Sequence, residues 1–452
     1  MDRWIETIYE HSPTTVQHAM ISLYGWKLAR LRYGGGYKKY VSELAHSERY
    51  SDRELAELQD TRLRALISHS YEQVPYYARL FREMRLSPGD FRTTADLVKL
   101  PILSKETVRT QSQAFYARNF LGGHCELVST SGTTGKTLRI RVDAEGRRRN
   151  FAFFGRLRFW AGIDPSARIA TFGGRTIVPI RAKRPPFWRH NIASKALLFS
   201  SYHLSEKTIP AYLEKLRSWD PQLLDGYPSS METVARFILD HSKQGPRPHA
   251  VITSSETLRP DQRAFIERAF NTRVFDQYGS AEQVCFISQC EAGSYHVHPE
   301  YGVTEFVPDS PSDPETKFRV VSTGFTNMAM PLLRYDTGDV AVPSDRTCIC
   351  GRNFPVVEEI TGRVDDLIIT PDGRRVGRLD PVFKGLGTIQ RAQIIQETGN
   401  RIKCAWCPAM AILIVISIVF AMNSKKDLAM TLNTSLSKCK TFPWGLEGNS
   451  AP

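Results

Sequence analysis

A short hydroxyl-rich segment carries the groups that bind a polyphosphate. Its sequence is TSGTTGKT, from Thr130 to Thr137. The glycines let the backbone turn sharply and expose its N–H groups, while the hydroxyls and the lysine ammonium add further donors and positive charge. Phosphate oxygens accept hydrogen bonds from all three kinds of group. The predicted phosphate site consists of Thr130, Ser131, Gly132, Thr133, Thr134, Gly135 and Lys136.

The segment differs from a Walker-type phosphate loop, whose pattern is GxxxxGK[ST]. Gly135-Lys136-Thr137 matches the end of that pattern, but position 130 holds threonine where the first glycine is needed. A Walker loop also opens a helix, whereas the apolar residues of 138–142 alternate with charged ones, which is typical of a strand. We therefore expect a strand–loop–strand hairpin. A helix after Lys136 would instead indicate a P-loop phosphotransferase, and a flexible surface turn is the remaining alternative.

Four further polar clusters follow in order along the chain, most of them at the end of an apolar run. Glycine, aspartate and serine are common in turns, so each cluster alone is weak evidence. Open α/β sheets, however, bind their ligands just beyond the carboxyl ends of strands, and the joint occurrence of the clusters favours such a site. The clusters are Ser254–Glu256, Asp276–Glu282, Arg334–Asp339 and Gly362–Asp366.

Cysteine and histidine side chains suggest a metal site in the same part of the chain. Cys348 and Cys350 form a tight pair, and with Cys290 and His296 they make the Cys₃His set that structural zinc sites use. Their C-x-C spacing is shorter than the usual spacing of about two to four intervening residues. Buried reduced cysteines are the alternative interpretation. His298, which precedes a proline, is expected to be a loop histidine.

Composition places these motifs in a soluble globular protein of more than one domain. The chain has 452 residues, of which 41% are hydrophobic and 24% are charged, and this length suggests about two or three packed units. The net charge of +13 favours anionic partners, a description that nucleotides and coenzymes meet. Basic runs such as Arg147–Arg149 are typical of solvated faces, so nucleic acid is not an expected partner. No signal peptide is visible and the eight cysteines are scattered, which favours a cytoplasmic protein.

Residues 1–100 are predicted to be the helical N-terminal part of a large domain. Leu55, Leu63 and Leu66 recur at the spacing of one helix face. The pattern stops near Val74-Pro75-Tyr76-Tyr77, where proline favours extended backbone.

Residues 101–362 are predicted to form the α/β core of that domain. Ser104 is a predicted helix N-cap. Beyond it, short apolar runs such as 169–172 alternate with helical segments such as Pro260–Phe270. Strands that alternate with helices predict layers of helix on a sheet.

Taken together, these motifs resemble those of the adenylate-forming enzymes, and in particular the phenylacetate–CoA ligase branch with its relatives linked to capsular polysaccharide synthesis. The hydroxyl-rich loop and three of the polar clusters match superfamily motifs. The resemblance extends from about residue 55 to about residue 397. Segments that resemble signatures of the branch are Val74–Tyr77, Leu100–Lys105 and Gly226–Ser229.

The resemblance implies an α/β protein with a large, multi-layer N-terminal adenylation domain and a small C-terminal α+β domain. It also implies that a carboxylate, of aryl or related type, attacks the α-phosphorus of ATP to give an acyl-adenylate and pyrophosphate. CoA would then accept the acyl group. The barrier of such a step is mostly electrostatic, so positioning and charge neutralisation are expected to carry catalysis. The implied partners are the acid, ATP with Mg²⁺, and CoA.

By the same resemblance, Lys136, Glu282 and Arg363 are the expected catalytic residues. The loop from Thr130 to Lys136 would hold the β- and γ-phosphates, and Glu282 would bind Mg²⁺, which prefers oxygen ligands. Asp339 would accept hydrogen bonds from the ribose hydroxyls, and Arg363 would approach the same sugar. The expected adenine pocket consists of Ser255, Glu256, Tyr278 and Gly279, and the expected acyl pocket of Tyr227, Pro228 and Ser229.

Structural roles are the alternatives for several of these residues. Asp339 would then cap a turn, Tyr278 would be core packing, and Ser229 or Ser230 would cap a helix over Glu232 to Leu239. Some relatives of the branch carry a similar cysteine cluster, so the resemblance also implies zinc at Cys290, His296, Cys348 and Cys350.

The C-terminal part departs from the family. Residues 363–403 resemble the start of the small domain, with Asp365 at the hinge position, but residues 404–424 are uncharged and strongly apolar. Three interpretations are open for 404–452. They are an altered or truncated domain end, a membrane-anchoring segment of borderline length for a bilayer core of about 30 Å, and a buried core strand or helix.

This departure affects the expected activity. Family members place a C-terminal lysine at the reacting groups, and no lysine of this tail lies in a matching motif. The alternative to an active ligase is therefore a nucleotide-binding but catalytically impaired homologue that acts as a partner or membrane-tethered protein.

Overall fold

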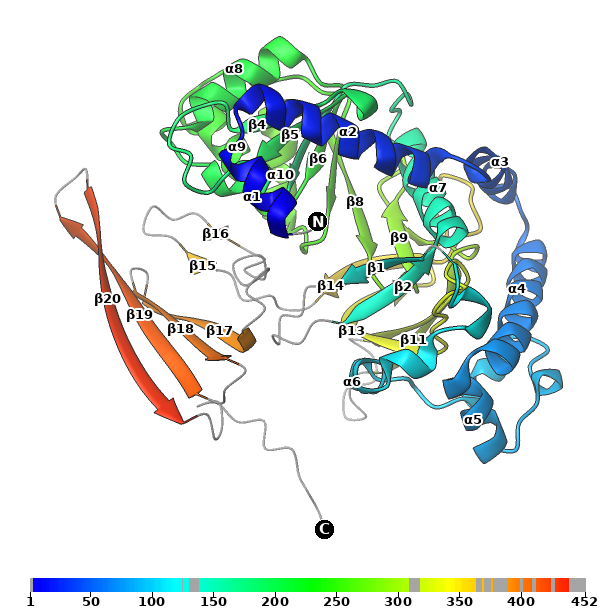
Figure 1. Ribbon diagram of the computed structural model, residues 1–452. Coiled ribbons are helices and arrows are strands. Elements are labelled where there is room, and N and C mark those ends of the chain that lie inside the picture. Colours follow the sequence, from blue (N-terminus) through cyan, green and yellow to red (C-terminus); the bar gives the residue numbers. More distant parts are fainter. Residues whose placement is uncertain are drawn as a thin grey trace. The chain divides into compact units, whose positions relative to one another are not determined.

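Helices dominate the N-terminal hundred residues of the chain (Figure 1). They are α1 (Arg3–His11), α2 (Thr14–Tyr33), α3 (Tyr37–Ser47), α4 (Asp52–Gln73) and α5 (Pro75–Glu83). A capping box starts α4, because the Glu54 carboxylate accepts the Ser51 backbone N–H at 2.8 Å and the Ser51 hydroxyl accepts that of Glu54 at 3.3 Å. The predicted apolar stripe is confirmed, since Leu55, Leu63 and Leu66 are all buried.

The break after α4 is shorter than predicted. Val74 is extended, with φ −105° and ψ 112°, but Pro75 is already the first residue of α5. Proline suits the first helical position because a backbone N–H there would have no intrahelical partner. The prediction of extended backbone was therefore right for Val74 and wrong for Pro75 to Tyr77.

The computed structural model describes residues 3–123, 125–129, 138–308, 318–362, 368–369, 375–376, 389–398, 401–408, 412–423 and 427–438. One compact unit contains the described residues of 1–130 and 139–364, and a second contains those from 365 onward. The four segments expected from the sequence, 1–100, 101–362, 363–403 and 404–452, stay predictions.

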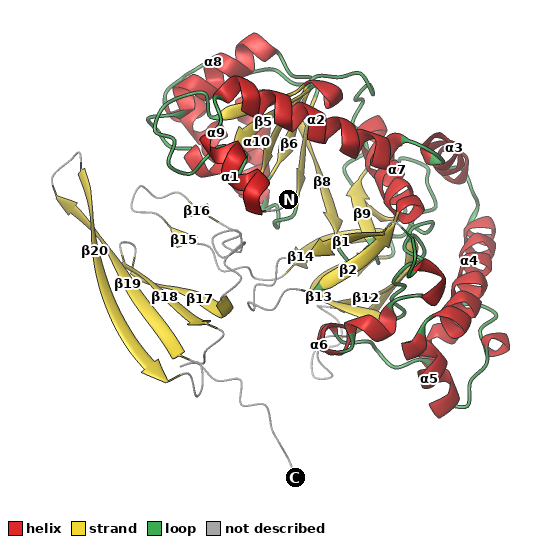
Figure 2. Ribbon diagram, viewed as in Figure 1, coloured by secondary structure: helices red, strands yellow, loops and turns green. Residues whose placement is uncertain are grey.

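A mixed sheet forms the centre of the first unit (Figure 2). In the described residues it contains twelve strands, in the spatial order β11-β12-β13-β14-β10-β9-β8-β7-β6-β3-β5-β4. β5, β3, β6, β7 and β8 pair in parallel, and the other pairs are antiparallel. The strands are β3 (Ile169–Gly173), β4 (Trp188–Asn191), β5 (Ala196–Ser200), β6 (Leu223–Gly226), β7 (Ala250–Ser254), β8 (Arg273–Gly279), β9 (Phe286–Gln289), β10 (Tyr295–Val297), β11 (Gly302–Pro308), β12 (Phe318–Gly324), β13 (Tyr335–Ser344) and β14 (Val356–Gly362).

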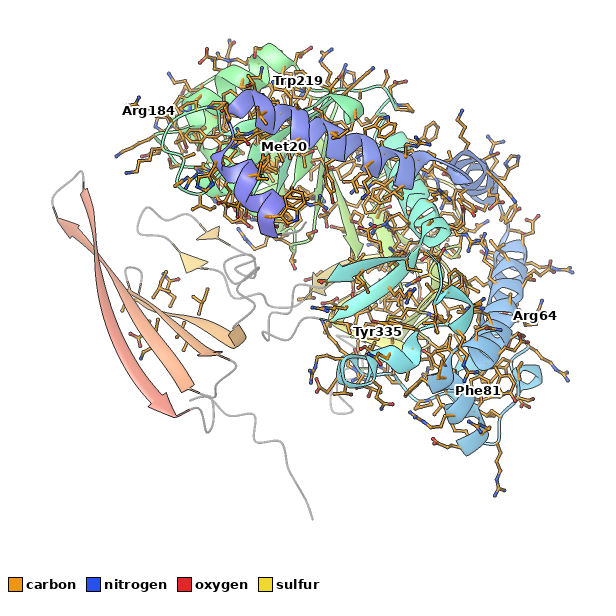
Figure 3. The ribbon with its side chains drawn as sticks, in the orientation of Figure 1. Met20, Arg64, Phe81, Arg184, Trp219 and Tyr335 are labelled. Carbon is orange, nitrogen blue, oxygen red and sulfur yellow. The ribbon has the colours of Figure 1, made fainter. Side chains whose placement is uncertain are left out.

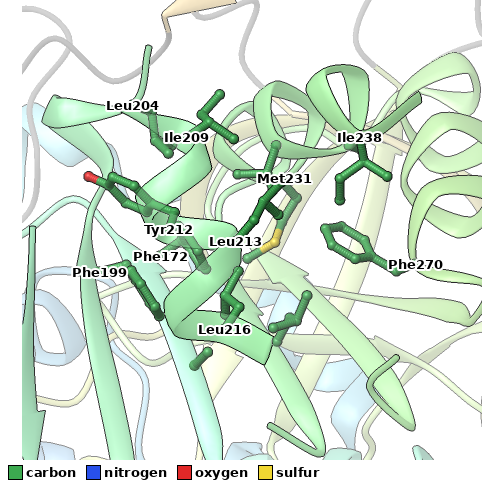
Figure 4. Packing of buried hydrophobic residues seen from close by; sticks show 14 of the residues in the cluster. Phe172, Phe199, Leu204, Ile209, Tyr212, Leu213, Leu216, Met231, Ile238 and Phe270 are labelled. Atoms are coloured by element: carbon green, nitrogen blue, oxygen red, sulfur yellow. The ribbon is translucent and has the colours of Figure 1, made fainter. Parts of the chain in front are cut away.

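Helices cover both faces of the parallel strands, as the α/β prediction requires. α8 (Ile209–Trp219), α9 (Pro228–Asp240) and α10 (Pro260–Phe270) contribute to one buried cluster, which Figure 4 shows. The C-terminal end of α7 (Ala144–Trp160) belongs to another. Leu223 and Leu224, adjacent in β6, enter different clusters. Successive side chains of a strand point to opposite faces, so the parallel strands are apolar on both.

The segment around the hydroxyl-rich loop is a hairpin, as predicted. β1 (Cys125–Ser129) and β2 (Arg139–Asp143) pair in antiparallel fashion, with Ser129 opposite Arg139. Residues 130–137, which contain every residue of the predicted phosphate site, lie outside the described residues. Because a strand and not a helix follows Lys136, the P-loop phosphotransferase is excluded.

Strands make up the described part of the second unit. β15 (Ile368–Ile369) pairs with β16 (Arg375–Val376), and a second sheet has the order β17-β18-β19-β20. Its strands are β17 (Ile389–Thr398), β18 (Arg401–Pro408), β19 (Ile412–Asn423) and β20 (Asp427–Lys438). The uncharged stretch 404–424 thus contributes to β18 and β19. Where the structure describes the chain, no helix has the length and hydrophobicity needed to cross a membrane.

Candidate active site

The predicted binding residues gather at the carboxyl edge of the parallel strands. Gly226 at the end of β6 lies opposite Phe172 of β3 and Thr253 of β7, and Ser254 of β7 lies opposite Gln277 of β8. The segments that leave these strands therefore start side by side, as the strand-end argument predicts. The end of β8 carries Tyr278 and Gly279, and the segments that follow the strands contain Gly174, Tyr227, Pro228, Ser229, Ser255, Glu256 and Glu282.

Glu256 connects the expected adenine and acyl pockets. Its carboxylate accepts hydrogen bonds from the backbone N–H and the hydroxyl of Ser229, both at 3.0 Å. Ser229 is the second residue of α9, which begins at Pro228. The carboxylate therefore caps a helix N-terminus, where negative charge is favourable. The alternative in which Ser229 or Ser230 is the N-cap was wrong, because Tyr227 holds that position.

Ser255, next to Glu256, has an unusual backbone conformation. Its φ of +74° lies in the left-handed region, and its side chain is exposed. A residue other than glycine in that region costs about 1–3 kcal/mol and persists only where the surroundings enforce it. This turn directs the chain from β7 toward the contact between Glu256 and Ser229.

Tyr278 and Asp339 form a direct pair between two strands. The Tyr278 hydroxyl donates to Oδ2 of Asp339 at 2.7 Å. Burial, together with the charge of Asp339, raises the pKa of Tyr278 well above its ordinary value of 10.0. The hydroxyl therefore stays protonated and orients the carboxylate. A carboxylate accepts about four hydrogen bonds, so this contact is compatible with the ribose-binding role expected for Asp339.

Glu282 is nearly buried and has two described partners. Its side chain is 6% exposed, and Oε1 accepts the hydroxyl of Tyr335 at 2.9 Å. Nζ of Lys105 lies 3.8 Å from the same oxygen. Figure 3 shows Tyr335 beside α6 (Lys105–Thr110), the helix that carries Lys105. An ammonium group and a hydroxyl donor therefore both face the carboxylate that is expected to bind Mg²⁺.

The wall of the expected acyl pocket is tightly packed at one point. A Cβ atom at Gly174 would lie 2.5 Å from the hydroxyl of Tyr227, whereas a Cβ at Gly173 would meet nothing within 4 Å. Tyr202 donates to the Gly174 carbonyl at 2.9 Å and holds that backbone in place. The Tyr227 ring can therefore keep this position only when residue 174 is glycine.

Sequence reasoning missed two residues of this site, Lys105 and Tyr335. Both lie in segments that the sequence singled out, but neither was given a role. Each is far from Glu282 in the sequence, and only the fold brings the three together. Two further predicted residues, Arg363 and Asp365, lie outside the described residues.

The predicted metal ligands come together. The ligand atoms of Cys290, His296, Cys348 and Cys350 all lie within 4.8 Å of one another. Sγ of Cys290 is 3.7 Å from Sγ of Cys348, and Sγ of Cys350 is 3.4 Å from Nε2 of His296. A tetrahedral zinc with Zn–S bonds of about 2.3 Å holds its thiolates about 3.8 Å apart, so the donor set and its spacing fit zinc.

The surroundings of the cluster also fit a metal. Nδ1 of His296 donates to the carbonyl of Phe354 at 3.1 Å, which leaves Nε2 toward the cysteines. His298 points elsewhere: it is buried and contacts Ser288 at 2.8 Å and Arg156 at 3.0 Å. His298 lies outside a strand, as expected, but within the core.

The chain is similar in sequence to several known proteins. No protein-family model matches. Protein CapK of Staphylococcus aureus is 30% identical over 363 residues, which cover 80% of this chain and 78% of that protein. The phenylacetate–coenzyme A ligase of Thermus thermophilus is 26% identical over 338 residues, with coverage of 70% and 72%. That of Escherichia coli is 23% identical over 330 residues, again with coverage of 70% and 72%.

Solved structures show the same fold. A 2-hydroxyisobutyryl-CoA ligase bound to 2-HIB-AMP and CoA in the thioesterification state gives a TM-score of 0.59 at 19% identity, with 81% of each chain covered. The same ligase in the postadenylation state with R3-HIB-AMP gives 0.57 at 17% identity, with 78% of each chain covered. The chain therefore belongs to the family of CapK and the phenylacetate–coenzyme A ligases, within the adenylate-forming enzymes.

Proposed function

We propose that this protein activates a carboxylic acid with ATP as an acyl-adenylate and then transfers the acyl group to CoA. The observation that carries the proposal is the convergence of Glu282, Tyr278, Asp339 and Glu256 at one edge of the sheet. Such an edge is where an α/β sheet binds its ligand. Relatives named as CoA ligases support the same reaction class and favour an active ligase over an impaired homologue.

The adenylation step needs charge neutralisation more than proton transfer. An oxygen of the substrate carboxylate forms a bond to the α-phosphorus of ATP, the bond from that phosphorus to the bridging oxygen breaks, and pyrophosphate leaves with the electron pair. Glu282 would bind Mg²⁺, which would supply positive charge at the phosphates. Lys136 and the hydroxyls and N–H groups from Thr130 to Gly135 would hold the β- and γ-phosphates.

The remaining residues would position the two ends of the substrate. Asp339, oriented by Tyr278, would accept the ribose hydroxyls, and Arg363 would approach the same sugar. Ser255, Glu256 and Gly279 would line the adenine pocket with the Tyr278 ring. Tyr227, Pro228 and Ser229 would line the acyl pocket, for which aryl acids are the first candidates. Asp365 would serve as the hinge between the adenylation and thioester steps.

We also propose that Cys290, His296, Cys348 and Cys350 hold a structural zinc ion. The loop that carries Cys348 and Cys350 contacts the helical N-terminal part just beyond them. Arg352 pairs with Glu48 at 3.0 Å and packs over the Trp160 ring, while Asn353 donates to the Tyr50 carbonyl at 2.9 Å. Zinc would fix the base of this loop and thereby fasten the connection between α3 and α4 to the sheet.

The test of the function is pyrophosphate release from ATP and Mg²⁺ with a panel of aryl and aliphatic acids, including phenylacetate and 2-hydroxyisobutyrate, with and without CoA. Release that depends on the acid establishes adenylation, and acyl-CoA formed only when CoA is present establishes the second step. ATP binding without release for any acid contradicts the proposal and indicates a nucleotide-binding homologue.

A further inference from the structure

Lys105 contacts the carboxylate that would bind Mg²⁺, although it comes from a distant part of the chain. Its Nζ lies 3.8 Å from Oε1 of Glu282, and the two side chains are 27% and 6% exposed. That distance exceeds the usual length of about 2.7–2.9 Å for a hydrogen bond between an ammonium and a carboxylate. The hydroxyl of Tyr335 already makes the hydrogen bond to this oxygen. Lys105 therefore acts on Glu282 through its charge.

The backbone places Lys105 firmly within the first unit. Leu103 forms a parallel bridge with Tyr335, in which the Leu103 N–H donates to the Arg334 carbonyl at 2.8 Å and the Leu103 carbonyl accepts from Asp336 at 3.0 Å. Ser104 then caps α6, as predicted, and accepts the Thr107 N–H at 3.1 Å. Lys105 follows directly, so its ammonium is held beside Glu282.

A second set of contacts, made by Arg334, holds the segment that leads to Lys105. Arg334 has a φ of +48° and forms an ion pair with Glu305. Its Nε donates to Oε1 and Oε2 of Glu305 at 3.1 and 3.0 Å, and its Nη2 donates to Oε1 at 2.8 Å. The same guanidinium donates to the carbonyl of Leu100 at 2.6 Å. Leu100 and Leu103 are thus both bonded to Arg334, which directly precedes β13, the strand that supplies Tyr335. A geometry held this firmly is what a positively charged group at a phosphate site requires.

We infer that Lys105 is a catalytic residue of the adenylation step that binds the phosphates of ATP. The inference rests on the proposed function and adds to it. Before nucleotide binds, the ammonium neutralises the nearly buried carboxylate of Glu282, which would otherwise be an unpaired buried charge. With Mg²⁺ held by Glu282, the Lys105 ammonium would supply further positive charge at the phosphates and would stabilise the charge that develops on the departing pyrophosphate.

Lys105 belongs to the same compact unit as Glu282. It therefore supplies positive charge at the phosphates from within the large domain.

The test compares Lys105→Met, which keeps an unbranched stem and removes the charge, with Lys105→Arg, which keeps the charge. Lys99→Met is the matched control, because Lys99 is exposed and pairs with Asp96 at 2.7 Å in the same N-terminal stretch. Three quantities are measured for each: acid-dependent pyrophosphate release, acyl-CoA formation from the isolated acyl-adenylate and CoA, and the Kd for MgATP.

Lys105→Met is expected to slow pyrophosphate release on the order of 10²-fold, as loss of one electrostatic contact to a transition state does. Acyl-CoA formation from the isolated adenylate should stay at the wild-type rate, and Lys105→Arg should recover much of the release. Unchanged release in Lys105→Met overturns the inference. Equal losses in both steps also overturn it, because they indicate a structural role.

If the proposed function itself is wrong, the same measurements give a different result. If the wild-type protein releases no pyrophosphate with any acid, the proposed function is wrong, and Lys105 is then judged by binding alone. Lys105→Met should weaken MgATP binding by about tenfold, while Lys99→Met should not. An unchanged Kd in Lys105→Met would remove Lys105 from the phosphate site.

Discussion

The hydroxyl of Tyr278 donates a hydrogen bond of 2.7 Å to Oδ2 of Asp339. The contact joins the end of β8 to β13 and fixes both side chains that are expected to face the nucleoside. Its strength depends on the protonation of the phenol. Burial and the nearby carboxylate hold the pKa of Tyr278 well above 10.0, so the proton stays on the tyrosine at physiological pH.

Substitutions at this pair should weaken ATP binding to different extents. Asp339→Asn removes the charge that accepts the ribose hydroxyls and should raise the Kd for ATP by roughly ten- to a hundredfold, since a hydrogen bond to a charged group contributes about 1.5–3 kcal/mol. Tyr278→Phe removes only the orienting bond and should raise it by about fivefold. Isothermal titration of each variant with MgATP measures both effects.

A second buried tyrosine–aspartate pair provides the control for those variants. Tyr295 donates to Oδ2 of Asp276 at 2.9 Å. Tyr295→Phe should lower stability without changing the Kd for ATP. If Tyr295→Phe weakens ATP binding as much as Tyr278→Phe does, the effect is structural and the assignment of Asp339 to ribose loses its support.

The pH dependence of binding should show the raised pKa of Tyr278. A raised pKa keeps the hydroxyl protonated as the pH rises through the ordinary value of 10.0. The ratio of the Kd values for ATP of Tyr278→Phe and the wild type should therefore stay constant between about pH 7 and 10. A ratio that falls toward one near pH 10 would mean that the phenol ionises there and that the hydrogen bond to Asp339 is lost.

Glu282→Gln tests the magnesium assignment. Glutamine keeps the size of the side chain and an oxygen that accepts the Tyr335 hydroxyl, but it lacks the negative charge. The Mg²⁺ concentration for half-maximal pyrophosphate release should rise by at least about tenfold. Tyr335→Phe is the control, because it keeps the carboxylate and removes one hydrogen bond of 2.9 Å. An identical Mg²⁺ titration in Glu282→Gln and the wild type would contradict the assignment.

Local patterns predicted much of this fold. The period-two alternation after Lys136 predicted the strand that is β2. The apolar runs before Ser255 and Tyr278 predicted two strands, whose ends lie side by side at one edge of the sheet. Residues near in sequence determine such features. The contact of Lys105 with Glu282 could not be predicted in this way, because it depends on the bridge between Leu103 and Tyr335.

Two local predictions failed because a tertiary contact or a positional preference decided the outcome. Ser229 has the residue type of an N-cap, but Glu256 from the next strand end supplies the capping carboxylate. Pro75 was expected to extend the chain, but it occupies the one helical position that favours proline. In both cases a residue that was expected to lie outside a helix lies in its first turn.

Substitution of Gly174 tests whether Tyr227 lines the acyl pocket. A methyl group at Gly174 would lie 2.5 Å from the Tyr227 hydroxyl, so Gly174→Ala must displace that ring. The KM for the preferred acid should then change by about tenfold or more, in the range of one to three kcal/mol that pocket contacts contribute, while the Kd for ATP stays the same. Gly173→Ala is the control, because a Cβ there meets nothing within 4 Å. Equal KM values in both variants would place the acyl group elsewhere.

If the four side chains bind zinc, substitution of one of the cysteines should remove the metal. Purified wild-type protein should contain about one equivalent of zinc, as a closed four-ligand site does. Cys348→Ser should lose it, whereas Cys125→Ser, whose cysteine lies in β1 outside the cluster, should keep it.

Because Arg352 and Asn353 tie the cysteine loop to Glu48 and Tyr50, loss of zinc should also speed amide hydrogen exchange around residues 48–51. Less than about a tenth of an equivalent in the wild type would show that the four side chains are a buried thiol cluster. Zinc loss with unchanged exchange at 48–51 would show that the metal does not fasten the helical N-terminal part.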